Sequence, residues 1–319
     1  MNSQLQLSED LKEEARKQGF FPVGIASIPG SKRLRMRTET LERWLENGNH
    51  ADMKWMEAPR RKSVETILEG VSSLLAVGLN YYVDKEKDSN ALSIARYAWG
   101  NDYHKIMKKR LTRVGRWLEE KRPNCQWKIC VDSSPVLDKA WAEEAGLGWI
   151  GKNSNLINSI NGSWMVIGHL LCTERLSPDK PAIANCDKCQ ICIDQCPTQA
   201  ITEPFVVDSR RCLAYHTIEN RNSELPSFIS SAMGSWVAGC DICQEICPWN
   251  KKPITSSTDP DVQPKDWILT LTKDKALNFT DNEWKEKLKG SALKRIKPNM
   301  WQRNIKAARI PKDKNSVLK

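Results

Sequence analysis

Four cysteines near the middle of the chain have the spacing of a [4Fe–4S] ligand set. They occur as Cys186-x2-Cys189-x2-Cys192-x3-Cys196, and a proline follows the last of them. In bacterial ferredoxins with this run, three close thiolates hold one cluster and the fourth binds the other cluster of a pair. Zinc is the alternative, because paired cysteines also bind it tetrahedrally. Four cysteines in this run before a proline favour iron–sulfur chemistry.

A second, shorter motif, Cys240-x2-Cys243-x3-Cys247-Pro248, matches the last three cysteines of the same run. Val237 occupies the position of the first cysteine, so one ligand must come from elsewhere, and Cys212 is the nearest unused cysteine. The cysteine before each proline is expected to cross to the other cluster. One cluster is therefore predicted to bind Cys186, Cys189, Cys192 and Cys247, and the other Cys196, Cys212, Cys240 and Cys243.

The remaining three of the eleven cysteines, Cys125, Cys130 and Cys172, share no motif and are predicted to be ordinary reduced thiols. The odd total and the tight local clusters argue against a secreted disulfide framework. The N-terminal residues carry neither an export signal nor twin arginines. No apolar run reaches the ~18 residues that a membrane span needs. We therefore expect a cytoplasmic protein with no membrane association.

The formal charge of +10 is concentrated at one end of the chain. Residues 285–319 contain twelve Lys or Arg and two acidic residues, so the rest of the chain is formally neutral. A basic segment of this kind either binds a polyanion or is a solvated run of charge, and its composition favours neither.

Helices and strands alternate over the first 175 residues. Ser8 is predicted to cap a short helix that stops before Gly19, and the apolar run 74–79 predicts a buried strand. Apolar residues at four-three-four spacing predict an amphipathic helix over 104–120 with basic outer faces. A strand over 127–131 and a helix over 136–145 follow. A type I′ turn at 161–162 is predicted to join strands at 155–159 and 163–171.

The composition changes twice along the chain. Residues 177–250 are rich in cysteine and have little room for a hydrophobic core, so bound metal is expected to stabilise them. Residues 255–260 have the composition of a polar linker. We predict an α+β fold in three parts. An α/β catalytic domain covers residues 1–175, a ferredoxin-like two-cluster domain covers 176–252, and a basic, mostly helical region covers 253–319.

Asp132 is the main candidate for acid–base chemistry, because the predicted strand 127–131 delivers it into a Ser-Ser-Pro loop. An aspartate there donates a proton if burial raises its pKa, although caps and turns are the more common role of such residues. His104 lies in an Asp-Tyr-His triplet, but Met107 replaces the glycine of the DxHxxG signature of cobalamin binding through histidine. The simpler interpretation of His104 is a helix start.

Several longer stretches are similar to the epoxyqueuosine reductase family over nearly the whole chain. They are Arg-Tyr-Ala-Trp-Gly-Asn-Asp-Tyr-His at 96–104, Val-Asp-Ser-Ser-Pro-Val-Leu at 131–137, Ala-Gly-Leu-Gly-Trp-Ile-Gly-Lys-Asn at 145–153, both cysteine motifs, and Arg-Cys-Leu-Ala-Tyr at 211–215. The resemblance implies a cobalamin-binding α/β domain, a two-cluster ferredoxin domain and a helical C-terminal region. It also implies an oxidoreductase that removes the epoxide oxygen of epoxyqueuosine at the wobble position of tRNA, the last step of queuosine synthesis.

The same resemblance assigns roles to individual residues. Asp132 aligns with the proton donor of the family, and positions implied to border cobalamin are Trp55, Ala95, Asp132, Leu156, Ile167, Leu213 and Ala238. A ferredoxin or flavodoxin is the implied electron donor, with electrons passing through two [4Fe–4S] clusters to cobalamin. The implied substrate is the anticodon loop of tRNA, which gives the basic C-terminal region a purpose. The protein is expected to act as a monomer.

Two other functions fit parts of the sequence. A reductive dehalogenase also combines cobalamin with two clusters. Such enzymes usually carry a twin-arginine signal, which this sequence lacks, and binding of a small substrate would not explain the basic region. A non-catalytic electron carrier would need only the cysteine-rich segment, which leaves the long first domain without a role. Cobalamin binding separates enzyme from carrier, and analysis of tRNA nucleosides separates the two enzymes.

Overall fold

A four-stranded antiparallel sheet forms the centre of the first half of the chain in this computed structural model, which describes residues 3–310. The strand order is β1 (Val23–Ser27), β2 (Ser73–Asn80), β7 (Met165–Cys172) and β4 (Trp127–Cys130). The predicted strands over 74–79 and 127–131 are therefore confirmed within one or two residues. Antiparallel pairing together with helices makes this a mixed α+β arrangement.

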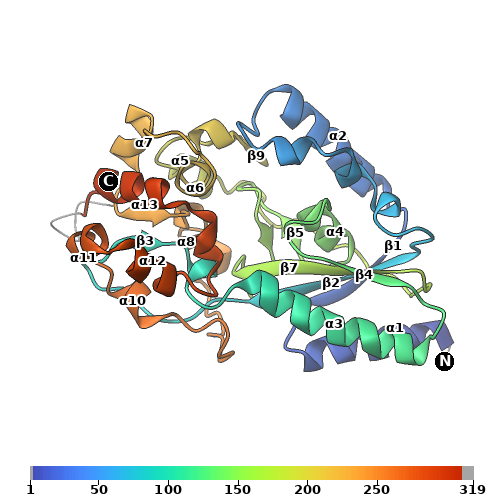
Figure 1. Ribbon diagram of the computed structural model, residues 1–319. Coiled ribbons are helices and arrows are strands. Elements are labelled where there is room, and N and C mark those ends of the chain that lie inside the picture. Colours follow the sequence, from blue (N-terminus) through green and yellow to red (C-terminus); the bar gives the residue numbers. More distant parts are fainter. Residues whose placement is uncertain (1–2, 311–319) are drawn as a thin grey trace.

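Helices cover both faces of this sheet (Figure 1). On one face lie α1 (Ser3–Lys17) and α3 (Tyr103–Lys121), and on the other lie α2 (Lys32–Glu46) and α4 (Asp138–Glu144). The predicted amphipathic pattern of α3 is confirmed, because its apolar stripe of Met107, Leu111, Val114 and Leu118 is fully buried. The buried apolar surface of these helices holds the sheet in a two-sided core.

Two local predictions are wrong. Ser8 does not cap a helix, since α1 begins at Ser3; the buried Ser8 hydroxyl donates to the Gln4 carbonyl oxygen and accepts from the Ser177 amide. The hairpin is also absent, because β6 (Leu156–Ile157) pairs with β5 (Trp149–Ile150), and β7 pairs with β2 and β4. The Asn158 side chain accepts from two following amides and closes a local turn instead.

The cysteine-rich segment contains only short elements. Its helices are α5 (Ile191–Asp194), α6 (Leu213–Ile218), α7 (Ser227–Ala232), α8 (Ile242–Glu245) and α9 (Pro248–Lys251). Its strands are β8 (Ile201–Glu203), β9 (Val206–Val207) and β10 (Trp236–Ala238), and β10 pairs in parallel with β3 (Ser93–Ile94). Such short elements agree with the expectation that bound metal stabilises this segment.

The basic C-terminal region folds around tryptophans. Its helices are α10 (Asp266–Leu269), α11 (Lys273–Asn278), α12 (Asp281–Lys287) and α13 (Pro298–Ala307). The rings of Trp284 and Trp301 stack with centroids 4.9 Å apart, in a core that also contains Ile94 and Val237. Arg303 is buried, and its guanidinium donates to backbone carbonyl oxygens of residues 216, 220 and 222. Part of the basic charge therefore stabilises the fold. Residues 311–319, at the end of the predicted basic region, lie outside the described residues.

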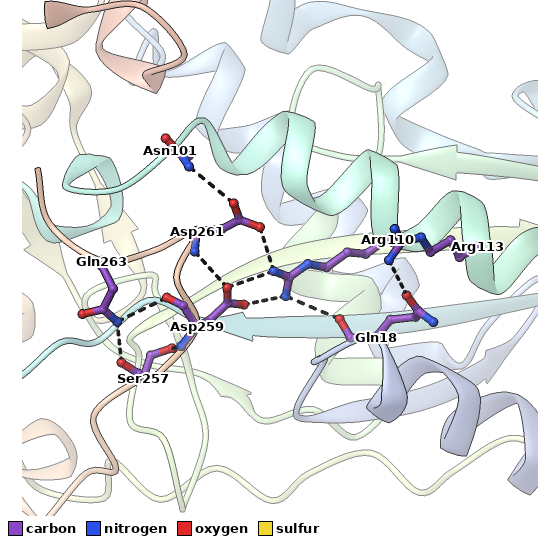
Figure 2. A network of polar contacts seen from close by, with 8 residues as sticks. All are labelled: Gln18, Asn101, Arg110, Arg113, Ser257, Asp259, Asp261 and Gln263. Carbon is purple, nitrogen blue, oxygen red and sulfur yellow. Dashed lines mark hydrogen bonds and ion pairs between the residues drawn. The ribbon is translucent and has the colours of Figure 1, made fainter.

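Residues 255–260, predicted as a linker, and the adjoining Asp261 are tied to α3 by one arginine (Figure 2). Arg110 donates from Nη2 to Asp259 Oδ1 at 2.9 Å and to Asp261 Oδ2 at 3.0 Å, and its side chain is only 14% exposed. Partial burial opposes the charge of Asp259, but the hydrogen bonds from Arg110 outweigh it and lower the pKa of this carboxyl group. The segment therefore joins the C-terminal region to the first half of the chain.

Arg110→Ala is expected to lower stability by about 1–3 kcal/mol, because it leaves two carboxylates without their cation. The thermal unfolding midpoint measures the loss, and amide hydrogen exchange at residues 255–261 locates it. Arg113→Ala is the matched control, since Arg113 lies one turn further along α3 and makes only a 3.3 Å contact with Gln18. Equal effects of the two variants would contradict this role of Arg110.

Among the described residues, no helix combines the length and the apolar character needed to cross a bilayer.

Candidate functional site

The end of strand β4 presents Asp132 in an unusual backbone conformation. Its φ is +48°, in the left-handed region that few residues other than glycine adopt. Its side chain is 58% exposed, whereas the neighbouring Val131 is fully buried. A short loop then leads to α4. Backbone strain of this kind is concentrated at functional sites, so the conformation supports a role for the Asp132 carboxylate.

The carboxylate of Asp132 is bound by a histidine from α3. His104 Nε2 lies 2.9 Å from Asp132 Oδ2, and His104 Nδ1 lies 2.7 Å from Asp102 Oδ1. Asp102 also caps α3 by accepting from the His104 amide at 3.1 Å. The predicted helix start is therefore correct, but it missed the second role of His104. The imidazole bridges two carboxylates.

This bridge sets the charges of the site. Partial burial favours neutral Asp132, yet the hydrogen bond and charge of His104 prevail and lower the pKa of Asp132. A pKa raised by burial, the condition for Asp132 to donate a proton by itself, is therefore not met while His104 is bound to it. Burial also opposes the charge of His104, but its bonds to Asp132 and Asp102 prevail and raise its pKa above 6.5. Between these two groups, the imidazole therefore holds the proton in preference to the Asp132 carboxylate.

Other charged and aromatic groups surround this pair. The Tyr103 ring stacks on the His104 ring with centroids 4.0 Å apart, and burial raises the pKa of Tyr103. Arg295, from the basic C-terminal region, helps to lower the pKa of Asp132 by its charge and is itself paired with Glu219 at 2.6 Å. The C-terminal region therefore reaches the surroundings of Asp132.

Arg61 and Lys139 lie beside the same loop. Arg61 is buried and donates to the carbonyl oxygens of Trp55 and Val136. The Lys139 side chain remains accessible, yet the surrounding protein desolvates its amine and lowers its pKa. Lys139 Nζ donates to the Ser154 carbonyl oxygen at 2.7 Å. Lys139 also interacts electrostatically with Cys212 and Cys243, which places it near these cysteines.

The residues expected to border cobalamin are only partly brought together. The Ala95 amide donates to the Ala238 carbonyl oxygen at 2.8 Å, and Leu156 and Ile167 share one apolar cluster. Leu213 packs in a different cluster, with Ile229 and Met233. Trp55 is 46% exposed and lies under the Arg61 guanidinium at 4.8 Å from its ring centroid. An exposed indole beside Asp132's loop fits a surface that a flat macrocycle covers.

The seven motif cysteines and Cys212 lie close enough for their charges to act on one another. Burial raises the pKa of Cys192 to about 11, and the charges of Cys247, Cys186 and Cys189 also raise it. Cys212, Cys196 and Cys192 act on Cys243, and Cys243 and Cys212 act on Cys240. Burial raises the pKa of Cys240 and Cys243 well above the ordinary value. These contacts place Cys247 near the first motif and Cys212 near Cys243, and the crossed assignment of ligands stays a prediction.

The predicted ligand sets are here called the first group (Cys186, Cys189, Cys192 and Cys247) and the second group (Cys196, Cys212, Cys240 and Cys243). The first group lines a cavity of about 400 Å³ together with Trp249 and Asn153. Cys247, the cysteine before the second proline, is thus brought to the first motif. No three His, Cys, Asp or Glu side chains within residues 3–310 are close enough to share a single ion. A [4Fe–4S] cluster instead places each thiolate on a different iron atom.

The three other cysteines are buried at the edge of the sheet, away from a motif. Cys125 contacts Cys172, and this hydrogen bond is the main reason that the pKa of Cys125 is lowered to about 6. Cys130 is more isolated, and burial raises its pKa to about 11.

Comparisons with known proteins agree with this geometry. A family model described as epoxyqueuosine reductase QueG, DUF1730, matches residues 61–133, and a 4Fe-4S double cluster binding domain matches residues 185–250. The chain is 60% identical to the epoxyqueuosine reductase of Synechococcus sp. (strain CC9605) over 96% of each chain. It is also 60% identical to that of Prochlorococcus marinus (strain NATL2A), over 96% of this chain and 98% of the other.

Solved structures of epoxyqueuosine reductases are also similar to this chain. An epoxyqueuosine reductase crystallised with an epoxyqueuosine-modified tRNA-Tyr stem loop is 26% identical, with a TM-score of 0.86 over 95% of this chain and 80% of that one. The Bacillus subtilis epoxyqueuosine reductase, whose aspartate-bearing catalytic loop is swung out of the active site, is 26% identical, with a TM-score of 0.85 over 95% of this chain and 81% of that one.

Proposed function

Because the chain belongs to the epoxyqueuosine reductase family, we propose that it reduces epoxyqueuosine to queuosine at the wobble position of tRNA. The observation that carries the proposal is the Asp132–His104–Asp102 bridge, in a loop whose following helix brings Lys139 near Cys212 and Cys243. Family membership favours this reaction over a dehalogenase or a simple electron carrier.

The cysteines and the surroundings of Asp132 would hold the cofactors. One [4Fe–4S] cluster would be held by Cys186, Cys189, Cys192 and Cys247, and the other by Cys196, Cys212, Cys240 and Cys243. Cobalamin would be bordered by Asp132 together with Trp55, Ala95, Leu156, Ile167, Leu213 and Ala238. Bound cobalamin supplies a strongly reducing, nucleophilic cobalt centre, and the clusters supply electrons one at a time. A ferredoxin or flavodoxin-type protein is the proposed donor, and we propose a cytoplasmic monomer.

The residues of the chain supply the protons. Conversion of an epoxide to an alkene consumes two electrons and two protons and releases the oxygen as water. Asp132 would give a proton to the departing oxygen, and His104 would return one to Asp132; their 2.9 Å contact supports this transfer. The low pKa of Asp132 makes this resupply necessary, because the free carboxyl group is almost fully ionised at neutral pH.

His104→Gln is expected to lower turnover about 10²-fold, because glutamine cannot carry the proton that Asp132 draws on. In the unaltered enzyme His104 loses its proton as pH rises through its pKa, which its carboxylate partners raise above 6.5, so the rate should fall over that range. The variant should lose this limb of the pH profile. Single-turnover rates measured with a chemical reductant from about pH 6 to pH 9 test this. His50→Gln is the control, and an unchanged profile in His104→Gln would contradict the proton relay.

Phosphate contacts from the C-terminal region would position the tRNA. Lys294 and Lys297 are exposed on either side of Arg295, whose charge acts on Asp132. Lys294→Ala/Lys297→Ala is expected to weaken tRNA binding and to reduce the slope of log K against log salt by about 0.7–0.9 for each phosphate that is no longer neutralised. Filter binding across a salt series measures both. Lys121→Ala, at the far end of α3, is the control and should leave the slope unchanged. If Lys121→Ala weakened tRNA binding as much as the double variant does, the C-terminal region would have no specific part in the tRNA interface.

The reaction itself is tested by anaerobic reconstitution. The protein would be loaded with iron, sulfide and cobalamin, reduced chemically, and incubated with tRNA that contains epoxyqueuosine. Nucleoside mass spectrometry should show queuosine, lighter by one oxygen. Unchanged epoxyqueuosine with fully loaded protein would contradict the proposed function.

A further inference from the structure

The cavity lined by the first group of cysteines is surrounded by unpaired positive charge. Lys152, Lys188 and Lys252 line it, and the exposed Lys251 precedes Lys252 in the chain; these four residues are here called the lysine rim. No member of the rim forms an ion pair within residues 3–310. Asp187 is the one acidic residue among the described residues that line the cavity. The rim is therefore a net positive surface over the candidate cluster site.

Two of these lysines are held in place by contacts that leave their charge intact. Lys152 Nζ donates to the Asp187 carbonyl oxygen at 2.6 Å, and Lys252 Nζ lies 3.7 Å from the centroid of the Trp249 ring. A cation over an aromatic face keeps its charge and loses some conformational freedom. Part of the rim is thus ordered before any partner binds, which reduces the entropic cost of docking.

Apolar side chains are exposed next to the rim. Ile191 lies between Cys189 and Cys192 and is 41% exposed, and Ile183, three residues before Cys186, is 80% exposed. Apolar residues within a charged border are the usual composition of a protein–protein interface. A nucleic acid backbone would pair with the lysines but would offer these isoleucines no apolar surface. The composition favours a protein partner.

The position of the rim beside the first candidate cluster site suggests that the partner delivers electrons. All four cysteines of the first group line the cavity that the rim borders, and no cysteine of the second group lines it. The rim therefore adjoins the first candidate cluster site and not the second. Electrons that enter at the rim would meet the first cluster before any other.

We infer that the lysine rim, with Ile183 and Ile191, is the docking surface for an acidic protein that delivers single electrons to the first cluster. This rests on the proposed function, because it requires clusters at the cysteines. Charge complementarity of this kind chiefly accelerates association and makes it sensitive to salt. The partner is therefore defined by a negative surface around its own redox centre.

Charge reversal tests the docking surface directly. The reconstituted full-length protein carrying Lys188→Glu/Lys251→Glu would be mixed with a reduced plant-type [2Fe–2S] ferredoxin. Stopped-flow absorbance would record the bleaching of the variant's [4Fe–4S] clusters as they are reduced. We expect the second-order rate to fall about 10-fold or more and to lose most of its salt dependence. Lys17→Glu/Lys121→Glu, at the ends of α1 and α3, is the matched control. Ile183→Ser should slow reduction but keep the salt dependence, because it removes only apolar contact.

Cluster bleaching needs no tRNA, so this test is independent of the reaction. Reduction by dithionite and the iron content should be unchanged in every variant. An unchanged ferredoxin rate in the rim variant would overturn the inference, as would an equal loss in the control. A weaker affinity for tRNA in the rim variant, with ferredoxin reduction intact, would assign the surface to RNA instead. Failure of the unaltered protein to make queuosine while its clusters bleach normally would count against the proposed function alone.

Discussion

Asp132→Asn is expected to reduce turnover about 10²- to 10⁴-fold, the usual contribution of a positioned acid. Asparagine tolerates the left-handed backbone at this position better than most residues, so the loop should keep its conformation. An amide can accept the hydrogen bond from His104 but cannot release a proton to the substrate. The loss should therefore appear in the rate of the chemical step.

Three measurements separate this effect from damage to the site. Iron content, cobalamin binding and tRNA affinity of Asp132→Asn should all match those of the unaltered protein. Ser133→Ala is the matched control, because it changes the neighbouring residue of the same loop and removes only a 3.4 Å contact with the Val131 carbonyl oxygen. Full single-turnover activity of Asp132→Asn would remove this residue from the mechanism.

Cys212→Ser is expected to remove one of the two clusters and to abolish turnover. Cys212 lies outside both motifs, yet its thiol is buried close to Cys196 and acts on Cys243. The iron content should fall from about eight to about four atoms per chain, because the first set of ligands remains complete. Electron paramagnetic resonance of the reduced variant should show a single cluster without the coupling of a pair.

Cys172→Ser provides the control for this substitution, since Cys172 is buried in β7 and belongs to neither ligand set. Its iron content should equal that of the unaltered protein. Cys247→Ser should also remove about four iron atoms, from the first cluster, if the ligands cross between motifs. A full complement of iron in Cys212→Ser would show that another residue is the eighth ligand.

Features that depend on local sequence were predictable. The apolar stripe of α3 repeats with the helical period, and the runs that became β2 and β4 are short and apolar, so their types followed from periodicity. The assignment of the eight cysteines to two clusters, from spacing plus one rule of ligation, stays a prediction. For the helix and the strands the information lies within a few residues of the position concerned.

Features that depend on contacts between distant residues were missed. His104 and Asp132 are 28 residues apart, and the polar linker is tied to α3 by an arginine about 150 residues earlier. The predicted hairpin was wrong because the chain turns earlier than expected. The Asn158 side chain accepts from the Asn161 amide and closes the turn, instead of the Asn-Gly pair at 161–162. An Asp-x-His triplet at a helix start, together with an aspartate at a strand end, was the signal that could have identified the bridge.

The most direct test of the account is the nucleoside content of tRNA from cells that lack this gene. Mass spectrometry should find epoxyqueuosine in place of queuosine, and the unaltered gene should restore queuosine, whereas Asp132→Asn should not. Normal queuosine in the deleted strain, or restoration by Asp132→Asn, would contradict the proposed reaction and the role of its proton donor.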